Sequence, residues 1–464
     1  MEMKRKYLTI REKALRINLD PNIYGSFAEI GAGQDVAQSF FNAGAASGTM
    51  AKTISAYDMK FSDAIYGEEK GGRYVCQSRS VKMIDKEYEL LEERLREFKP
   101  DTRFFAFANT VTVLNFKKSN QGHGWIGLRF QLDADSPPND LIMHVALRDN
   151  HRHLQQQTIG ILGVNLIYAC YYHHDDADEL LLSLMDHVDR DRFDIDMLKL
   201  TGPQFEHIDN RLLSLRLVKH GMSDATMFGS DGNVLQPSEE LYKKNIFALR
   251  GRFRPITHVN MDMFEQGVKM FKADEDVYEN NVIVLAELTL NNLRGKSESK
   301  EIDEQDFLDR VDILASLGYT VLISSYQEYY RLVEYLSSFT RKRKIGILLG
   351  VYNLADVFKE KFYTRLKGGI LEAFGKLFFK DLKVYLYPLK DERTQEIKTS
   401  ENLKVHPRMK ELYKFFKYNG KVIDIKDFDP EILDVFSKRW LIECNHVPRP
   451  GVTSIPILVK FGFS

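Results

Sequence analysis

The second half of the chain alternates between short apolar segments and longer segments with helical periodicity. Seven segments between residues 193 and 389 are rich in β-branched and aromatic residues, and most precede a helical stretch; residues 420–425 could form an eighth strand. Apolar strands that alternate with helices are typical of a parallel sheet covered on both faces. The pattern predicts a mostly parallel, (β/α)-barrel-like domain, with an open doubly wound sheet as the alternative.

The first half of the chain has a different pattern. Residues 1–100 are mostly helical in periodicity, whereas residues 101–148 contain β-type segments joined by short polar turns, which favour antiparallel neighbours. We therefore expect an α/β protein with four regions. These are a helical N-terminal region (1–100), antiparallel β structure plus a helical segment (101–190), the repeat domain (191–390), and a C-terminal cap and arm (391–464).

Composition restricts the class of protein and its partners. The chain has 464 residues, 44% of them hydrophobic, and 65 basic residues balance 66 acidic ones. This balance gives no overall field that would attract nucleic acid or an anionic membrane. The three cysteines are far apart, the N-terminus has no apolar leader, and the longest apolar stretch (159–172) is shorter than a membrane span. We expect a soluble cytoplasmic protein without a membrane or nucleic-acid partner.

Several segments together resemble a known protein family. They are ALRDNHRHLQQQTIGILGVNLIYACYYHHDD (146–176), KLTGPQFEHIDNRLLSLRLV (199–218), LQPSEELYKKNIFALRGRFRPITHVNMDM (235–263) and GGILEAFGKLF (368–378). They resemble a bacterial family of cytoplasmic proteins without an established activity, sometimes labelled TonB-dependent receptor or nicotinate-nucleotide adenylyltransferase. The chain lacks the lipid-facing strands of such a receptor, and QGHGW (121–125) lacks the H-x-G-H expected of such a transferase. The resemblance covers nearly the whole chain but implies no catalytic residue.

Three arginines stand at alternate positions where one predicted strand ends. In an extended chain Arg250, Arg252 and Arg254 would point the same way. At the carboxyl end of a central parallel strand they would face the place where ligands bind, and guanidinium groups suit bidentate binding of phosphate or carboxylate. The spacing predicts an anion-binding site, with ion pairs to acidic residues as the alternative.

Other polar residues could join this site. Lys199 lies in an otherwise apolar strand, where a desolvated amine can act as a nucleophile or bind an anion; a snorkelling or ion-paired lysine is the alternative. We expect Glu287, at the end of a strand, or Asp209, near a helix start, to transfer protons. Arg211 could contribute to the anion site, and helix capping explains Asp209 equally well.

The segment FAEIGAGQ (27–34) resembles the strand–loop element of S-adenosylmethionine-dependent methyltransferases. Cofactor binding there requires a strand before Gly31, a helix after Gly33 and an acidic residue after the next strand, for which Asp58 is the candidate. The preceding strand is short, and no regular strand–helix series follows until residue 190. We therefore expect Gly31 and Gly33 to serve close packing or turns, with cofactor binding as the alternative.

A histidine- and aspartate-rich segment, HHDDADE (173–179), suggests a metal site. His174 and Asp178 are four residues apart and could bind one ion from a helix. Asp176 and Glu179 also fit the N-cap and the capping-box acid of a following helix. The alternative to a metal site is therefore a polar break between two helices.

Two functions of different classes fit these observations. The first is an enzyme that acts on a phosphorylated or carboxylated small metabolite bound at the carboxyl ends of parallel strands. The second is a self-assembling scaffold without catalysis, suggested by the lack of a catalytic signature and by a C-terminal arm (445–464) with several Pro and Gly residues. We expect a homo-oligomer. A nucleotide- or S-adenosylmethionine-dependent transferase that uses the loop 31–34 is a lesser alternative, and the sequence assigns no cofactor.

Overall fold

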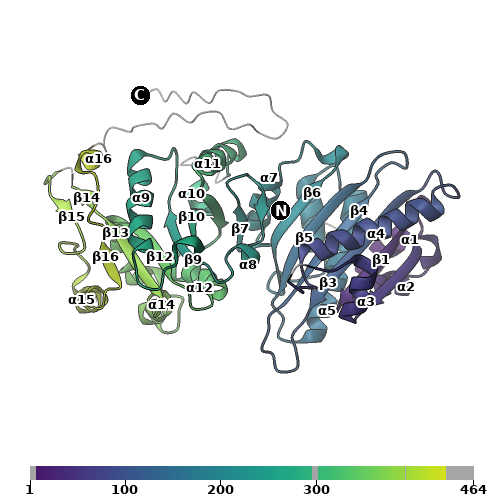
Figure 1. The fold of residues 1–464 in the computed structure, drawn as a ribbon, viewed down its shortest axis with the longest axis horizontal. Coiled ribbons are helices and arrows are strands. Elements are labelled where there is room, and N and C mark those ends of the chain that lie inside the picture. Colours follow the sequence, from purple (N-terminus) through teal and green to yellow (C-terminus); the bar gives the residue numbers. More distant parts are fainter. Residues whose placement is uncertain (1–6, 70, 295–300, 392, 435–464) are drawn as a thin grey trace. The chain divides into compact units, whose positions relative to one another are not determined.

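The computed structural model describes residues 7–434 except 70, 295–300 and 392. By their internal contacts the residues form two compact units, 1–224 and 225–464, and each is built on its own sheet (Figure 1). The expected C-terminal arm and Cys444 lie outside the described residues. Within the described part of the chain, no helix combines the length and apolar character that crossing a bilayer requires.

The first unit contains a six-stranded mixed sheet in the order β2-β1-β3-β4-β5-β6. β1 is parallel to both β2 and β3, and the pairs from β3 to β6 are antiparallel. The strands are β1 (Ile23–Gly31), β2 (Met50–Ala56), β3 (Arg103–Thr112), β4 (Gly122–Phe130), β5 (Asn139–Leu147) and β6 (Phe193–Thr201).

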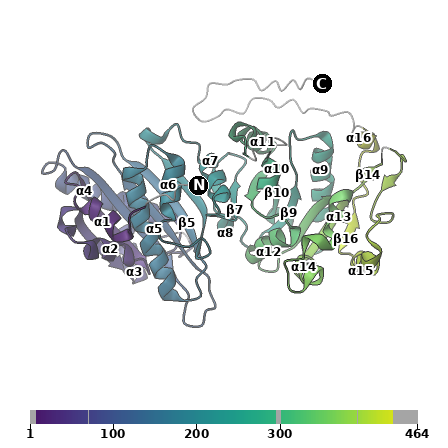
Figure 2. The same cartoon turned by 180° about the vertical axis from the view of Figure 1, so that it is seen from behind.

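Helices cover both faces of this sheet. α1 (Ile10–Asn18), α2 (Asp35–Ala43), α5 (Arg152–Tyr172) and α6 (Ala177–Leu184) lie on one face (Figure 2). α3 (Met59–Tyr66) and α4 (Gln77–Leu95) lie on the other (Figure 1), and α7 (Asn210–Lys219) follows β6. The apolar α5 buries most of its side chains because it is enclosed by the sheet and its neighbouring helices.

The sequence prediction for this unit is correct in part. β3, β4 and β5 form the expected antiparallel structure, and α5 and α6 form the helical segment. Residues 1–100 are not mainly helical around 23–56, where β1 and β2 lie. Residues 193–201 pair with β5, so the segment 191–224 belongs to this unit rather than to the following repeat domain.

The second unit contains an eight-stranded sheet in the order β16-β13-β12-β9-β10-β11-β7-β8. The six strands from β16 to β11 are parallel, and β7 and β8 extend one edge in antiparallel fashion. The strands are β7 (Ala225–Phe228), β8 (Val234–Leu235), β9 (Asn245–Arg250), β10 (Val282–Thr289), β11 (Thr320–Ser324), β12 (Ile345–Gly350), β13 (Leu382–Tyr387) and β16 (Val422–Asp424). β14 (Leu389–Lys390) and β15 (Ile397–Lys398) form a separate ribbon.

Helices lie on both faces of the second sheet as well (Figure 1). One face carries α9 (His258–Lys272) and α11 (Glu304–Ser316), and the other carries α12 (Tyr329–Thr340), α14 (Gly369–Leu377) and α15 (Lys410–Tyr418). The shorter helices are α8 (Pro237–Glu240), α10 (Leu290–Leu293), α13 (Val351–Val357) and α16 (Pro430–Asp434).

The expected barrel is wrong, because this sheet is open. Its edges are β16 and β8, whereas a closed barrel has no edges and pairs its strands in chain order. After β11 the chain crosses back and adds β12 on the other side of β9. The parallel strands lie in the order β11-β10-β9-β12-β13-β16. Numbered from one to six along the chain, this is the order 3-2-1-4-5-6 of a doubly wound fold, the alternative that the sequence pattern also allows.

Candidate functional site

The carboxyl ends of the parallel strands in the second unit carry two of the predicted site residues. Arg250 ends β9 and pairs in register with Glu287 of β10. Ser324, at the end of β11, pairs with Thr289 of β10. These side chains therefore lie at the edge of the sheet where doubly wound proteins bind their ligands.

Arg250 and Glu287 form a buried bidentate ion pair. Arg250 Nε and Nη2 lie 2.8 and 2.9 Å from the two carboxylate oxygens, and Ser324 Oγ donates to Glu287 Oε1 at 2.6 Å. Nη1 of Arg250 donates to the Gln327 carbonyl at 2.8 Å, and the ring of Tyr329 lies 4.4 Å from its guanidinium carbon. The hydrogen-bonding capacity of Arg250 is thus mostly used within the protein.

This pairing joins Arg250 and Glu287 to each other, and their predicted roles in anion binding and proton transfer stay predictions. Burial opposes the charge of Arg250, but the attraction of Glu287 outweighs it, so the pKa of Arg250 is raised. Glu287 has no exposed surface and accepts hydrogen bonds from two side chains. A carboxylate held in this way is suited to fixing Arg250 rather than to exchanging protons with a ligand.

The loop after β9 holds a second group of charges. Arg254 Nε lies 2.9 Å from Asp306 Oδ1 of α11, and Arg310 of the same helix binds the other oxygen of Asp306. Arg310 Nη1 also donates to the Arg252 carbonyl at 3.0 Å. Arg252 is exposed, and among the described residues it forms no ion pair.

Positive charge is in excess in this loop. The pKa of Arg310 is lowered, first by burial and then by the nearby charges of Arg254 and Arg252, although Asp306 raises it. Within the described residues the buried Arg310 Nε has no hydrogen-bond partner. The guanidinium groups of Arg254 and Arg310 therefore share the carboxylate of Asp306, and that of Arg252 is a third positive charge near Arg310. We name Arg252, Arg254, Arg310 and Asp306 the arginine loop cluster.

The cluster follows the central strand of the doubly wound sheet. β9 leads through α9 to β10 on one side, whereas the chain reaches β12 on the other side through α12. The switch point therefore lies between β9 and β12. Gly350 ends β12, and among the described residues no heavy atom lies within 4 Å of the position that a Cβ would take there.

Three predicted site residues belong to the first unit instead. Asp209 caps α7 by accepting from the Arg211 amide at 2.9 Å, and its carboxylate pairs with Arg211 Nη2 at 2.7 Å. Lys199 lies half-buried on β6. The capping alternative describes the contacts of Asp209, and the roles proposed for Lys199 and Arg211 stay predictions.

The glycine loop after β1 packs against β3. Gly31 has a φ of +83°, and a Cβ there would lie 2.1 Å from the Val111 carbonyl oxygen. At Gly33 a Cβ would lie 1.8 Å from Asn109 Oδ1. β1, α2 and β2 do supply the strand, helix and parallel strand of a nucleotide loop, contrary to our expectation. Asp58, however, caps α3, so the loop's contacts favour packing.

His174 and Asp178 have separate partners. His174 Nε2 lies 3.1 Å from Asp175, and Asp178 Oδ1 lies 2.9 Å from His220 Nε2. Asp176 caps α6 through two backbone amides. Across the described ranges no group of three or more His, Cys, Asp or Glu side chains is placed to hold a metal ion.

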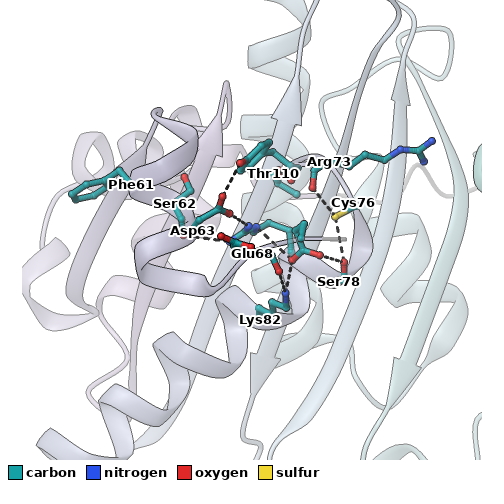
Figure 3. Close-up of polar contacts among 12 residues, drawn as sticks. Phe61, Ser62, Asp63, Glu68, Arg73, Cys76, Ser78, Lys82 and Thr110 are labelled. Carbon is teal, nitrogen blue, oxygen red and sulfur yellow. Dashed lines mark hydrogen bonds and ion pairs between the residues drawn. The ribbon is translucent and has the colours of Figure 1, made fainter. Parts of the chain in front are cut away.

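A further polar cluster of the first unit contains the buried Arg79, and Figure 3 shows its members Asp63 and Thr110 among the polar contacts of this region. Arg79 Nη2 lies 2.6 Å from Asp63 Oδ1, and its Nε lies 3.6 Å from Glu69. Tyr74 donates to Asp63 at 2.9 Å, and its carbonyl accepts from Thr110 at 2.5 Å. The cluster therefore fixes the segment that joins α3 to α4 onto the sheet.

Asp306 and Arg310 were not among the residues predicted for the site. They stand at i and i+4 on the predicted helix 303–318, which is an ordinary exposed ion-pair spacing. That spacing indicates a helix face but says nothing of the loop after β9. Only the packing of α11 brings this pair to Arg254.

Comparison with known proteins does not assign this arrangement. No family model and no curated protein match the chain. Among solved structures it is similar to the competence/damage inducible protein CihA from Agrobacterium tumefaciens, at 17% identity over 36% of this chain and 98% of that one, with a TM-score of 0.25. It is also similar to a competence or damage-inducible protein from Enterobacter asburiae, at 9% identity over 35% of this chain and 99% of that one, with a TM-score of 0.25. A third similar structure is a competence-damaged protein (CinA) superfamily protein from Escherichia coli, at 12% identity over 39% of this chain and 95% of that one, with a TM-score of 0.24.

Proposed function

We propose that the second unit binds a phosphorylated small metabolite and that the protein is an enzyme acting on it. The excess positive charge of the arginine loop cluster, next to the switch point of a doubly wound sheet, supports this proposal. Arg252 and Arg254 would contact the phosphate because both are exposed. Arg310 would hold the loop through the Arg252 carbonyl.

The charge count favours phosphate over a single carboxylate. Asp306 neutralises one of the three guanidinium groups, which leaves two positive charges. A phosphate monoester carries about −1.5 to −2 charges at neutral pH, so it matches this excess. The proposal gives Arg250 and Glu287 a supporting role, because their mutual ion pair uses most of their hydrogen-bonding capacity.

Calorimetry tests this proposal directly. The protein is titrated with a mononucleotide and with a sugar phosphate, each beside its dephosphorylated counterpart. We expect only the phosphorylated compounds to bind, and the double variant Arg252→Gln/Arg254→Gln to bind at least about tenfold more weakly. Arg365→Gln is the matched control, because Arg365 is an exposed arginine elsewhere in the same unit. Equal binding to the double variant and the wild type would rule the proposal out.

A self-assembling scaffold is the alternative function. β2 is an edge strand, and the residues after it expose apolar side chains, with Tyr57 77% and Phe61 56% exposed. Unpaired edges next to apolar surface favour association with another chain. Light scattering over a range of protein concentrations distinguishes the two functions, since a particle that stays monomeric throughout cannot be a self-assembling scaffold.

A transferase that uses the loop 31–34 is the lesser alternative. The parallel arrangement of β1, α2 and β2 supports it, whereas the packing of Gly31 and Gly33 against β3 opposes it. If S-adenosylmethionine or a nucleotide binds equally well to the wild type and to Arg252→Gln/Arg254→Gln, this result would favour a site in the loop 31–34 over a site in the second unit.

A further inference from the structure

Helix α1 has apolar side chains on two sides. It packs against α2 and α5 (Figure 2). The buried face that makes these contacts contains Lys13, Ala14, Ile17 and Asn18. Leu15 and Leu19 are each two residues from Ile17, which places them about 160° around the helix from it. These two leucines therefore belong to the side of α1 that faces away from its packing partners.

A groove with a volume of about 560 Å³ runs along this outer side. Its lining includes Leu8, Leu15 and Leu19 and, beside them, the charged residues Glu12 and Arg16. Leu8 and Leu15 are half-buried, and Leu19 is 64% exposed. Apolar surface that is open to solvent in this way marks a surface for interaction. We name it the α1 groove.

The two charged side chains of the groove are held in place. Oε2 of Glu12 accepts from the Thr9 amide at 2.7 Å in the capping box of α1. Arg16 Nη1 donates to the Tyr168 hydroxyl at 2.8 Å, and its guanidinium carbon lies 4.2 Å from the centre of the Tyr172 ring. Glu12 and Arg16 are both exposed and four residues apart, so they are neighbours on one flank of the leucines.

Two copies of the α1 groove are complementary about a two-fold axis. An axis perpendicular to α1 makes the two helices antiparallel and brings the same flank of each helix to the same side. When this axis passes midway between Glu12 and Arg16, Glu12 of each copy lies opposite Arg16 of the other copy. Leu8 then lies opposite Leu19 of the other copy, and Leu15 lies near the axis. Two ion pairs therefore flank one apolar seam.

We propose that the α1 groove is a self-association surface and that its occupant is α1 of a second copy of the chain, packed antiparallel. Apolar side chains alone would accept many partners, whereas one acid and one base on the same flank match their own two-fold copy. The contact is isologous and closes at two copies. Because α1 has only 9 residues, we expect a dissociation constant in the micromolar range. The dimer does not depend on the ligand proposed for the second unit.

Sedimentation equilibrium of the full-length protein is the first test. We expect a monomer–dimer equilibrium in the wild type. Leu19→Asp should raise the dissociation constant at least about tenfold, because it places a carboxylate in the apolar seam. Leu371→Asp is the matched control, since Leu371 is a leucine of α14 with a similar exposed fraction, 67%. A wild type that stays monomeric up to about 1 mM would leave the groove to another partner and overturn the proposal, as would equal effects of the two variants.

The second test exchanges the charges. Glu12→Lys and Arg16→Glu each place like charges opposite one another at both positions, so each variant alone should dimerise at least about tenfold more weakly. In an equimolar mixture, the introduced lysine faces the introduced glutamate, and Arg16 of one variant faces Glu12 of the other. We therefore expect heterodimers to form with a dissociation constant close to that of the wild type.

Heterodimer formation would identify the antiparallel arrangement, since other contacts between two copies do not pair these positions reciprocally. Circular dichroism shows whether both variants fold. Two folded variants that do not associate with each other would overturn the proposal. Glu12→Lys removes the capping box, whereas Leu19→Asp leaves it intact, so the first test decides on its own if Glu12→Lys does not fold.

Discussion

Buried ionisable groups in the two units have different surroundings. In the first unit, burial is the main cause that raises the pKa of Glu29 to about 7 and lowers that of His123 to about 4. Asp194, whose pKa burial raises to about 6, is nevertheless paired with Arg148, and Lys13 and Asp186 form a buried ion pair. In the second unit, Arg250 and Glu287 satisfy each other at the sheet edge, and Asp306 pairs with two arginines. Buried groups without a full counter-charge favour their neutral forms, whereas matched pairs stay charged.

This difference predicts which unit's stability depends on pH and which unit's stability depends on intact ion pairs. The first unit should respond to pH in the range where its unmatched groups titrate. The second unit should respond most strongly to the loss of one member of a pair.

The largest effect is expected when the pair at the edge of the second sheet is broken. Arg250→Met leaves the fully buried Glu287 without its counter-charge, which should destabilise the protein by about 3–5 kcal/mol. Urea denaturation measures the loss. Arg250→Met/Glu287→Gln is the control, since it leaves no isolated charge and should recover a large part of the stability. A double variant as unstable as the single one would show that packing, not charge, governs this site.

The next effect concerns Glu29. Its pKa is raised to about 7 in the folded protein, from an ordinary value of 4.5, mainly by burial. Its contribution to stability is therefore fully present below pH 4.5 and is lost as the pH rises through 7. Glu29→Gln should stabilise the protein above pH 7 by about 3 kcal/mol and have little effect near pH 4.5. Thermal unfolding of both proteins at the two pH values measures this, and an equal shift at both would contradict it.

The effect at His123 has the opposite sign. Its folded pKa of about 4 lies below the ordinary 6.5, so its contribution is present above pH 6.5 and is lost as the pH falls through 4. His123→Gln should reduce the acid-induced loss of stability between pH 6.5 and 4 by about 2 kcal/mol, because the residue is half-buried. His151→Gln is the control, since His151 is an exposed histidine of the same unit. If the two variants lose stability equally on acidification, His123 is not the group that titrates.

The smallest effect on stability is expected at Arg254. Its side chain is 51% exposed, so Arg254→Gln should change the free energy of unfolding by about 0–1 kcal/mol. If Arg254 binds the ligand, the same variant should nevertheless weaken binding of a phosphorylated compound several-fold. Loss of stability without loss of binding would place Arg254 among the structural pairs, together with Arg250.

Part of the candidate site could be predicted from the sequence. The strand ends that carry Arg250 and Glu287 were located because apolar strand segments end there. The prediction that the three arginines point the same way assumed an extended strand. β9 ends at Arg250, however, and the following residues form a loop. Arg254 therefore reaches Asp306, whereas Arg250 reaches Glu287.

A β-bulge likewise changes the faces of β6. Between the pairs His144–Met197 and Ala146–Asp194, β6 has one residue more than β5. Ile195 and Leu198 both join the apolar core as a result, although regular alternation would place them on opposite faces. No pattern within β6 marks such an insertion, since it depends on the register with the neighbouring strand.

The sequence by itself determined the strand and helix segments of the second unit and the antiparallel β3–β5, and it offered the caps at Asp176 and Asp209 as alternatives. These depend on periodicity and on side chains within a few residues of one another. Only the tertiary structure decided that the second sheet stays open, that β6 joins the first sheet, and which carboxylate meets each arginine. Such choices depend on contacts between residues that are far apart in the chain, where many pairings have similar local preferences and packing selects among them.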